Sequence, residues 1–149
     1  MAVQRDRPYE RSNFLVDLGT GDPHDARAMF LRVDLPHATV DEIAYRSGSA
    51  RTNEEQKEPG LASYTHLVLT RGLIGSTDLW DWWKLARQGD KNVDRNIVVS
   101  LLDEERNEVW RWHFRNAFPV GYHTTALDTL SADPVAEVVT LTFDSMEID

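Results

Sequence analysis

Short runs of β-branched and aromatic residues, bounded by Gly, Pro, Asp and Asn, follow one another along most of the chain. Runs of this kind predict β-strands. The first two are separated by the turn-rich sequence TGDPHD, so we expect them to form a hairpin. The seven runs occupy residues 13–19, 28–35, 38–48, 63–72, 95–103, 108–116 and 135–148.

Alternation within these runs indicates which side chains face a core. Successive side chains of a strand point to opposite faces of its sheet. In the sixth run Trp110, Trp112 and Phe114 therefore share one face, and in the seventh Val139, Leu141 and Phe143 do so. We expect the apolar face of each strand to be buried and the other face to be wetter.

Helical periodicity is found only between Ser76, a candidate N-cap, and Gly89, a candidate stop. Asp78 near the start and Arg87 near the end carry the charges that the helix dipole favours. Trp80 lies at the edge of the apolar stripe and is expected to be partly covered. The stripe itself, with spacing i, i+3, i+4 and i+7, consists of Leu79, Trp82, Trp83 and Ala86.

The strands and the helix together predict a mainly β fold, in which two packed antiparallel sheets form a sandwich or barrel with one short helix. A length of 149 residues fits a single domain, 1–149. Within it, residues 1–12 are expected to form an N-terminal arm. Residues 47–62 carry charge, Pro and Gly without an apolar period, and are expected to form an extended exposed loop.

The composition removes several kinds of chemistry. Without cysteine the chain has no disulfide, no thiolate zinc site and no cysteine nucleophile. A formal charge of −9 argues against a nucleic-acid-binding surface, which needs clustered cations. No run approaches the roughly 18 apolar residues of a membrane-spanning segment, and no signal-peptide pattern opens the chain, so we expect synthesis in the cytoplasm.

Charge is unevenly distributed along the chain. Arg5, Arg7 and Arg11 lie close to the N-terminus, whereas residues 116–149 contain six acidic side chains and no Lys or Arg. Two solvated termini are the more common explanation of such a pattern. The alternative is that the complementary ends of neighbouring copies attract each other.

No catalytic, cofactor or metal site is predicted. The one candidate metal cluster, Asp22, His24 and Asp25, is more typical of a solvated turn. The sequence has neither a nucleophile elbow nor a phosphate-binding loop. Tryptophans beside Asp78 and Asp81 have the composition of a sugar site, which keeps two alternatives open: a small hydrolase, and a carbohydrate-binding β-sandwich with exposed tryptophans.

Seven short motifs follow one another from residue 13 to residue 148. They are NFLVDLG (13–19), YRSG (45–48), KEPGL (57–61), YTHLVLTRGL (64–73), LWDWW (79–83), NAFPVGY (116–122) and VAEVVTLTFDSMEI (135–148). Their order and spacing together resemble one family, the tail-tube proteins of contractile phages and the inner-tube proteins of contractile injection systems.

The resemblance implies a structural subunit with no enzymatic activity and no cofactor. Six copies would form a ring around a strand-lined lumen, and stacked rings would form a hollow tube inside a sheath protein. Baseplate or spike proteins would lie at the tube end, and cargo protein or DNA would pass through the lumen. Such a subunit assembles in the cytoplasm and becomes part of a phage virion tail or an injection-system particle. Polar strand residues such as Thr70 and Arg71 are then candidates for lining the lumen.

The resemblance also implies contact residues. It makes 47–62 an interface loop that contacts the next ring or subunit, with the N-terminal arm as a second contact. The expected contact residues are Arg46, Lys57, Glu58, Pro59 and Gly60 around the loop, and Arg5, Arg7 and Arg11 in the arm. The helix, through its stripe of Leu79, Trp82, Trp83 and Ala86, would be a structural cap on the sandwich.

Overall fold

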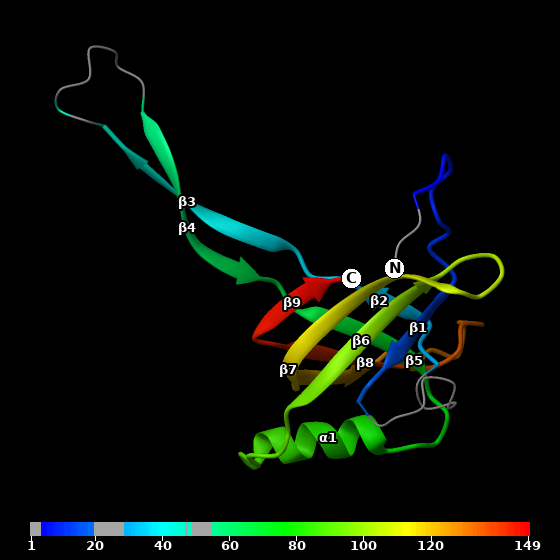
Figure 1. Ribbon diagram of the computed structural model, residues 1–149. Coiled ribbons are helices and arrows are strands. Elements are labelled where there is room, and N and C mark those ends of the chain that lie inside the picture. Colours follow the sequence, from blue (N-terminus) through cyan, green and yellow to red (C-terminus); the bar gives the residue numbers. More distant parts are fainter. Residues whose placement is uncertain (1–3, 20–28, 47, 49–54) are drawn as a thin grey trace. The chain divides into compact units, whose positions relative to one another are not determined.

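The computed structural model (Figure 1) describes residues 4–19, 29–46, 48 and 55–149, in which there are nine strands and one α-helix. The chain forms two compact units, one of residues 1–35 and 66–149 and the other of residues 36–65. The single tube-protein domain expected over 1–149 stays a prediction.

The larger unit is built on a seven-stranded antiparallel sheet. Its strands lie in the order β1 (Phe14–Asp17), β6 (Arg95–Leu102), β7 (Glu108–Thr124), β8 (Ala136–Thr142), β5 (Leu67–Gly72) and β2 (Arg32–Asp34), and β9 (Ser145–Ile148) also pairs with β7. Strands that are far apart in the sequence, such as β1 and β6, thus pair in the sheet. A short connection between two strands does not by itself make them a hairpin.

Two expectations about strand connections are wrong. The first two runs do not pair with each other, because β1 pairs with β6 and β2 pairs with β5. The last run is not one strand, because the chain turns at Asp144 between β8 and β9. The Asp144 carboxylate accepts a hydrogen bond of 2.8 Å from the Asn116 side chain, and its backbone N–H donates to the carbonyl of Arg115. Both errors concern pairing across long sequence separations, which local patterns do not encode.

Strand β7 belongs to both layers of the sheet. Its first part pairs with β6 and β9, so that Phe114 lies opposite Ile97 and Met146, and its second part pairs with β8. Between the two parts Asn116 has a φ of 54°, a conformation that Asn tolerates better than most residues. The sheet therefore folds over itself along β7, and the expected mainly β, two-layer antiparallel fold is confirmed.

The core lies between the two layers and against the helix. It consists of Val16, Leu18, Phe30, Leu67, Leu69, Leu79, Trp82, Ile97, Val99, Phe114, Ala117, Val139 and Leu141. The alternation expected for Val139, Leu141 and Phe143 is confirmed for the first two, which are fully buried, whereas Phe143 is only partly buried. Phe114 is buried as expected, whereas Trp110 and Trp112 are only half-buried.

Helix α1 (Asp78–Arg87) contacts β7 and covers one end of the larger unit (Figure 1). Leu79 and Trp82 are almost completely buried. Trp83 and Ala86, expected in the same stripe, are half-buried, and Trp80 is exposed. The buried stripe is therefore narrower than the helical spacing suggested.

The sequence predicted the C-terminal end of α1 correctly but placed its N-cap one residue too early. Thr77, and not Ser76, is the N-cap, because the helix begins at Asp78. The Ser76 hydroxyl instead donates to the Asp78 carboxylate at 2.9 Å. The helix does stop before Gly89, whose φ of 75° is the left-handed conformation that glycine favours. The N–H groups of Gly89 and Asp90 donate to carbonyls of the last helical turn, which completes this C-terminal cap.

The smaller unit is a hairpin of β3 (Ala38–Tyr45) and β4 (Gln56–Tyr64). The loop expected over 47–62 is therefore wrong in its second half, since residues 56–62 belong to β4. Of the first half, residues 47 and 49–54 lie outside the described residues. The strand had no apolar period because neither of its faces is buried.

Candidate functional site

The hairpin β3–β4 has no core of its own. Every residue of β3 is exposed, and in β4 only Gly60 is half-buried. Val40, Ile43 and Leu61 leave 54%, 51% and 80% of their surface in contact with solvent. An isolated two-stranded hairpin is at best marginally stable in water, so these apolar side chains favour a protein partner as their cover.

A β-bulge sets the shape of the hairpin. Val40 lies opposite Ala62 and Glu42 lies opposite Pro59, so Asp41 alone faces two residues of β4. A Cβ atom on Gly60 would lie only 3.0 Å from the carbonyl oxygen of Asp41. Gly60 is therefore required by the close approach of the two backbones.

The other contact residues expected on the hairpin are accessible. The Lys57 ammonium lies 3.0 Å from the Glu42 carboxylate, and the Arg46 guanidinium lies 3.9 Å from Glu55. Both cations remain more than half exposed. Exposed pairs of this kind contribute little to folding stability and can exchange partners on binding.

The N-terminal arm is bound to its own chain through Arg5. The Arg5 guanidinium donates to both carboxylate oxygens of Glu104, at 3.0 and 2.9 Å, and lies over the ring of Tyr9. The Arg5 hydrogen bond holds the pKa of Glu104 below its usual value. Arg7 and Arg11 are exposed. Of the three arginines expected to contact a neighbour, Arg5 is thus already paired within this chain.

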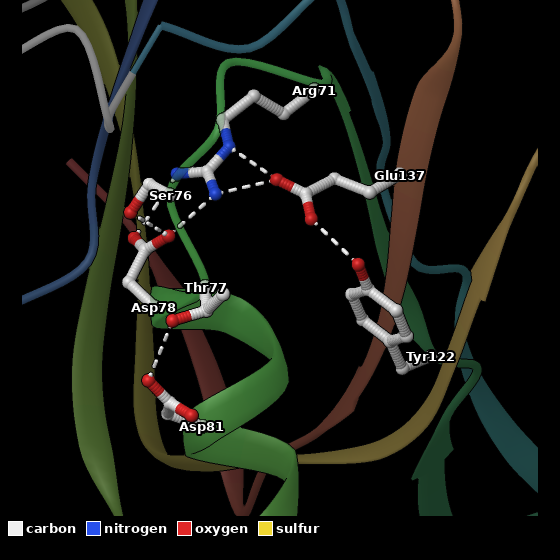
Figure 2. Close-up of polar contacts among 7 residues, drawn as sticks. All are labelled: Arg71, Ser76, Thr77, Asp78, Asp81, Tyr122 and Glu137. Carbon is white, nitrogen blue, oxygen red and sulfur yellow. Dashed lines mark hydrogen bonds and ion pairs between the residues drawn. The ribbon is translucent and has the colours of Figure 1, made fainter.

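A buried polar network fixes the start of α1 (Figure 2). Arg71 on β5 is fully buried, and its Nε donates to Glu137 on β8 at 2.8 Å. The same guanidinium donates to Asp78, the first residue of α1, at 3.0 Å. Tyr122 on β7 donates its hydroxyl to the other Glu137 oxygen at 2.7 Å. Four elements of the larger unit are therefore linked through Arg71 and Glu137.

Electrostatics within the network favour its charged form. Burial raises the pKa of Asp78, but hydrogen bonds from Arg71 and Ser76 outweigh this effect and hold the pKa below its usual value. Burial and the hydrogen bond to Glu137 raise the pKa of Tyr122 to about 12. The Asp78 carboxylate therefore remains ionised and the Tyr122 phenol remains protonated at neutral pH.

Sequence reasoning missed this network and placed Arg71 among candidates for the lumen. Arg71 continues the inward face of Leu67 and Leu69 at spacing two, and Glu137 continues that of Val139. The two positions lie directly opposite each other in the β5–β8 pair. A charged residue that falls on the buried face of a strand needs a partner of opposite charge. Arg71 and Glu137 each fall on such a face, and this is the sequence signal that could have revealed the pair.

The tryptophans of α1 do not form an open platform. Trp82 is buried and donates its indole N–H to the carbonyl of Val93 at 2.8 Å. Trp80 and Trp83 stack on each other with ring centroids 5.1 Å apart. Asp78 and Asp81 have other partners, Arg71 and Thr77. The sugar-site composition thus reflects core packing, aromatic stacking and helix anchoring.

The described residues were also considered as a possible metal site and as a possible membrane span. Those residues contain no cluster of three His, Asp or Glu side chains that could hold a metal ion. The cluster considered from the sequence, Asp22, His24 and Asp25, lies outside the described residues. No helix among the described residues is long and apolar enough to span a membrane.

The chain thus combines a folded-over antiparallel sheet and a capping helix with a separate hairpin whose side chains are exposed. The chain belongs to the family described as T4-like virus tail tube protein gp19, whose model matches residues 10–147. No curated protein matches the chain in sequence.

Several solved structures have the same fold, and an extracellular contractile injection system is among their sources. A chain of the anti-feeding prophage baseplate, 6-fold symmetrised, has a TM-score of 0.83 and 22% identity, with 97% of each chain covered. A chain of the sheath-tube complex of an extracellular contractile injection system has a TM-score of 0.82 and 25% identity, covering 97% of this chain and 93% of that one. Hcp1 from Flavobacterium johnsoniae is more distant, with a TM-score of 0.54, 15% identity, and 91% and 94% coverage.

These findings define the role of the chain. It is a structural subunit of the inner tube of a contractile phage tail or contractile injection system, and not an enzyme. The expected family membership is confirmed. The carbohydrate-binding alternative gains no support from the comparisons.

Proposed function

We propose that six copies of this chain form a ring and that the rings stack into a tube with a strand-lined lumen for cargo protein or DNA. Similar chains occur in a 6-fold symmetrised baseplate, in a sheath-tube complex and in a tube-terminating cap. A sheath protein around the tube and baseplate or spike proteins at its end are the corresponding partners. The subunit is assembled in the cytoplasm before it enters the particle.

The single observation that carries the proposal is the uncovered hairpin β3–β4. Both its faces expose apolar side chains, and among the described residues its strands pair only with each other. Unpaired strand edges associate readily with other chains. A neighbouring subunit in the same or the next ring would cover the hairpin, with Arg46, Lys57, Glu58, Pro59 and Gly60 at the contact.

The N-terminal arm provides a second contact in this proposal. Arg7 and Arg11 are exposed and available to carboxylates of a neighbour, whereas Arg5 keeps the arm on its own chain by pairing with Glu104. A contact made by Arg7 and Arg11 would weaken as salt screens exposed charges over about 8–10 Å.

The test is the assembly state of the purified full chain. Negative-stain microscopy and analytical ultracentrifugation should show six-membered rings and, at high concentration, tubes. Ile43→Asp places a charge on the uncovered hairpin and should abolish tubes, while the exposed helix variant Leu85→Asp serves as control. A wild-type chain that stays monomeric at every concentration would overturn the proposal.

A further inference from the structure

Strand pairing brings three segments with exposed apolar side chains to the same end of the sheet, where β5 ends and where β2 and β8 begin. These side chains come from the segments of the larger unit that precede β2, follow β5 and precede β8. We call them the end cluster: Met29, Leu31, Leu73, Ile74, Leu127 and Leu130, which are between 51% and 93% exposed. Patches of this kind on a soluble subunit mark protein interfaces.

Backbone hydrogen bonds hold the three segments together. The N–H of Leu31 donates to the carbonyl of Thr70 at 2.8 Å, and the N–H of Leu73 donates to the carbonyl of Val135 at 2.9 Å. The segment bearing Leu127 and Leu130 is anchored at its base by Thr125, whose N–H donates to the carbonyl of Ala136. The end cluster is therefore part of the folded unit.

The loop that presents Leu127 and Leu130 is ordered by its own polar groups. The Asp128 carboxylate accepts the N–H of Leu130 at 2.9 Å, and the Asp128 carbonyl accepts the N–H of Ser131. The Ser131 hydroxyl in turn accepts the N–H of Asp133. Both leucines are held in solvent and not folded back onto the sheet, which lowers the entropic cost of binding a partner.

We propose that the end cluster is the receiving surface for the β3–β4 hairpin of a second copy of this chain. The inference rests on the proposed tube function and specifies which surface of the next subunit covers the hairpin. The hairpin offers matching chemistry, since Val40, Ile43 and Leu61 are its most exposed large apolar side chains.

The apolar area fits an interface of ordinary size. Burial of one such side chain removes about 60–120 Å² of apolar surface, as follows from about 1.5–3 kcal/mol at about 25 cal/mol per Å². At the exposures seen, the six side chains offer roughly 250–500 Å². A standard interface buries about 800 Å² on each partner, of which about 56–65% is apolar. The end cluster thus supplies roughly half or more of the apolar surface that one stable contact needs.

The positions of the two surfaces give the contact a direction. The hairpin is joined to the larger unit after β2 and before β5, at Leu35 and His66, whereas the end cluster lies before β2 and after β5. Because the two surfaces share no residue, one copy can offer its hairpin to one neighbour and its end cluster to another, which is a heterologous contact. When such a contact joins successive rings, it leaves free hairpins at one end of the stack and free end clusters at the other, and the stack can therefore continue.

Cross-linking tests the contact directly, because the chain contains no cysteine of its own. Full-length Leu61→Cys protein is mixed with differently tagged Leu130→Cys protein and oxidised. Mixed disulfide dimers should form at least about tenfold faster than with Val120→Cys, an exposed control residue on β7. Mixed dimers no faster than this control would overturn the inference.

A charge in the end cluster tests its role in stacking. Leu130→Asp should leave the melting temperature and the rings unchanged and reduce the tube fraction at least about tenfold, whereas Val120→Asp should assemble like the wild type. Normal tubes from Leu130→Asp would overturn this inference alone. A wild-type chain that forms neither rings nor tubes would overturn the proposed function, and the inference with it.

Discussion

The strand pair β5–β8 and the hairpin β3–β4 have the same antiparallel ladder but opposite burial. Leu67, Leu69 and Arg71 of β5 are fully buried, whereas no residue of β3 is. The first pair owes its stability to a core shared with other strands and with α1. The second has strand geometry without a core, which is expected where the covering surface belongs to another molecule.

The largest expected difference between the two regions is the loss of folding stability when an aromatic side chain is removed. Trp82→Ala removes a buried indole from the core and should lower the free energy of unfolding by about 3–5 kcal/mol. Tyr45→Ala on the hairpin should cost less than about 1 kcal/mol, because that ring is exposed. Urea unfolding of both variants measures the difference. Equal losses of unfolding free energy would mean that the hairpin is packed against other residues of its own chain.

The ion pairs of the two regions provide the next comparison. Arg71→Met leaves buried Glu137 without its cation and should cost about 3–5 kcal/mol, the usual result of breaking a buried pair from one side. Lys57→Met breaks the exposed pair with Glu42 and should cost at most about 1 kcal/mol. Thermal unfolding at neutral pH compares them. A small loss for Arg71→Met would show that the network does not hold α1.

Alkaline pH should weaken the same network through Tyr122. Its folded-state pKa of about 12 lies above the ordinary 10.0, so its contribution is complete below pH 10.0 and is lost as the pH rises towards 12. The stability difference between wild type and Tyr122→Phe should be about 1 kcal/mol near neutral pH, the usual net contribution of one partly exposed hydrogen bond, and shrink above pH 10.0. Chemical unfolding of both proteins across this range provides the measurement. A difference that stays constant would contradict the hydrogen bond to Glu137.

The smallest effect on folding is expected on the hairpin. Ile43→Ser should change the free energy of unfolding of the dispersed chain by no more than about 0.5 kcal/mol, because the side chain is already exposed. The same change should nevertheless reduce tube formation, which sedimentation measures. Val120→Ser on β7 is the matched control. A large loss of stability in Ile43→Ser would show that the hairpin is packed within one chain.

Local patterns predicted what depends on local burial. The strands of the core, the capping helix and the stop at Gly89 follow from alternation, helical spacing and glycine chemistry. The strand β4 could not be predicted from such patterns, because a strand exposed on both faces has no apolar period. Pairing of β1 with β6 and the contact of Arg71 with Glu137 join residues far apart in sequence, and no short pattern specifies such partners.

The sharing of β7 by both layers has a mechanical consequence. Its 17 residues form ladders with β6 and β9 in one layer and with β8 in the other. A force that pulls on one layer therefore reaches the other along a single covalent backbone, in addition to any transfer through side-chain contacts. Sliding of the layers would require several backbone hydrogen bonds to break together. In a tube wall, the larger unit of each subunit should therefore resist shear between its two layers.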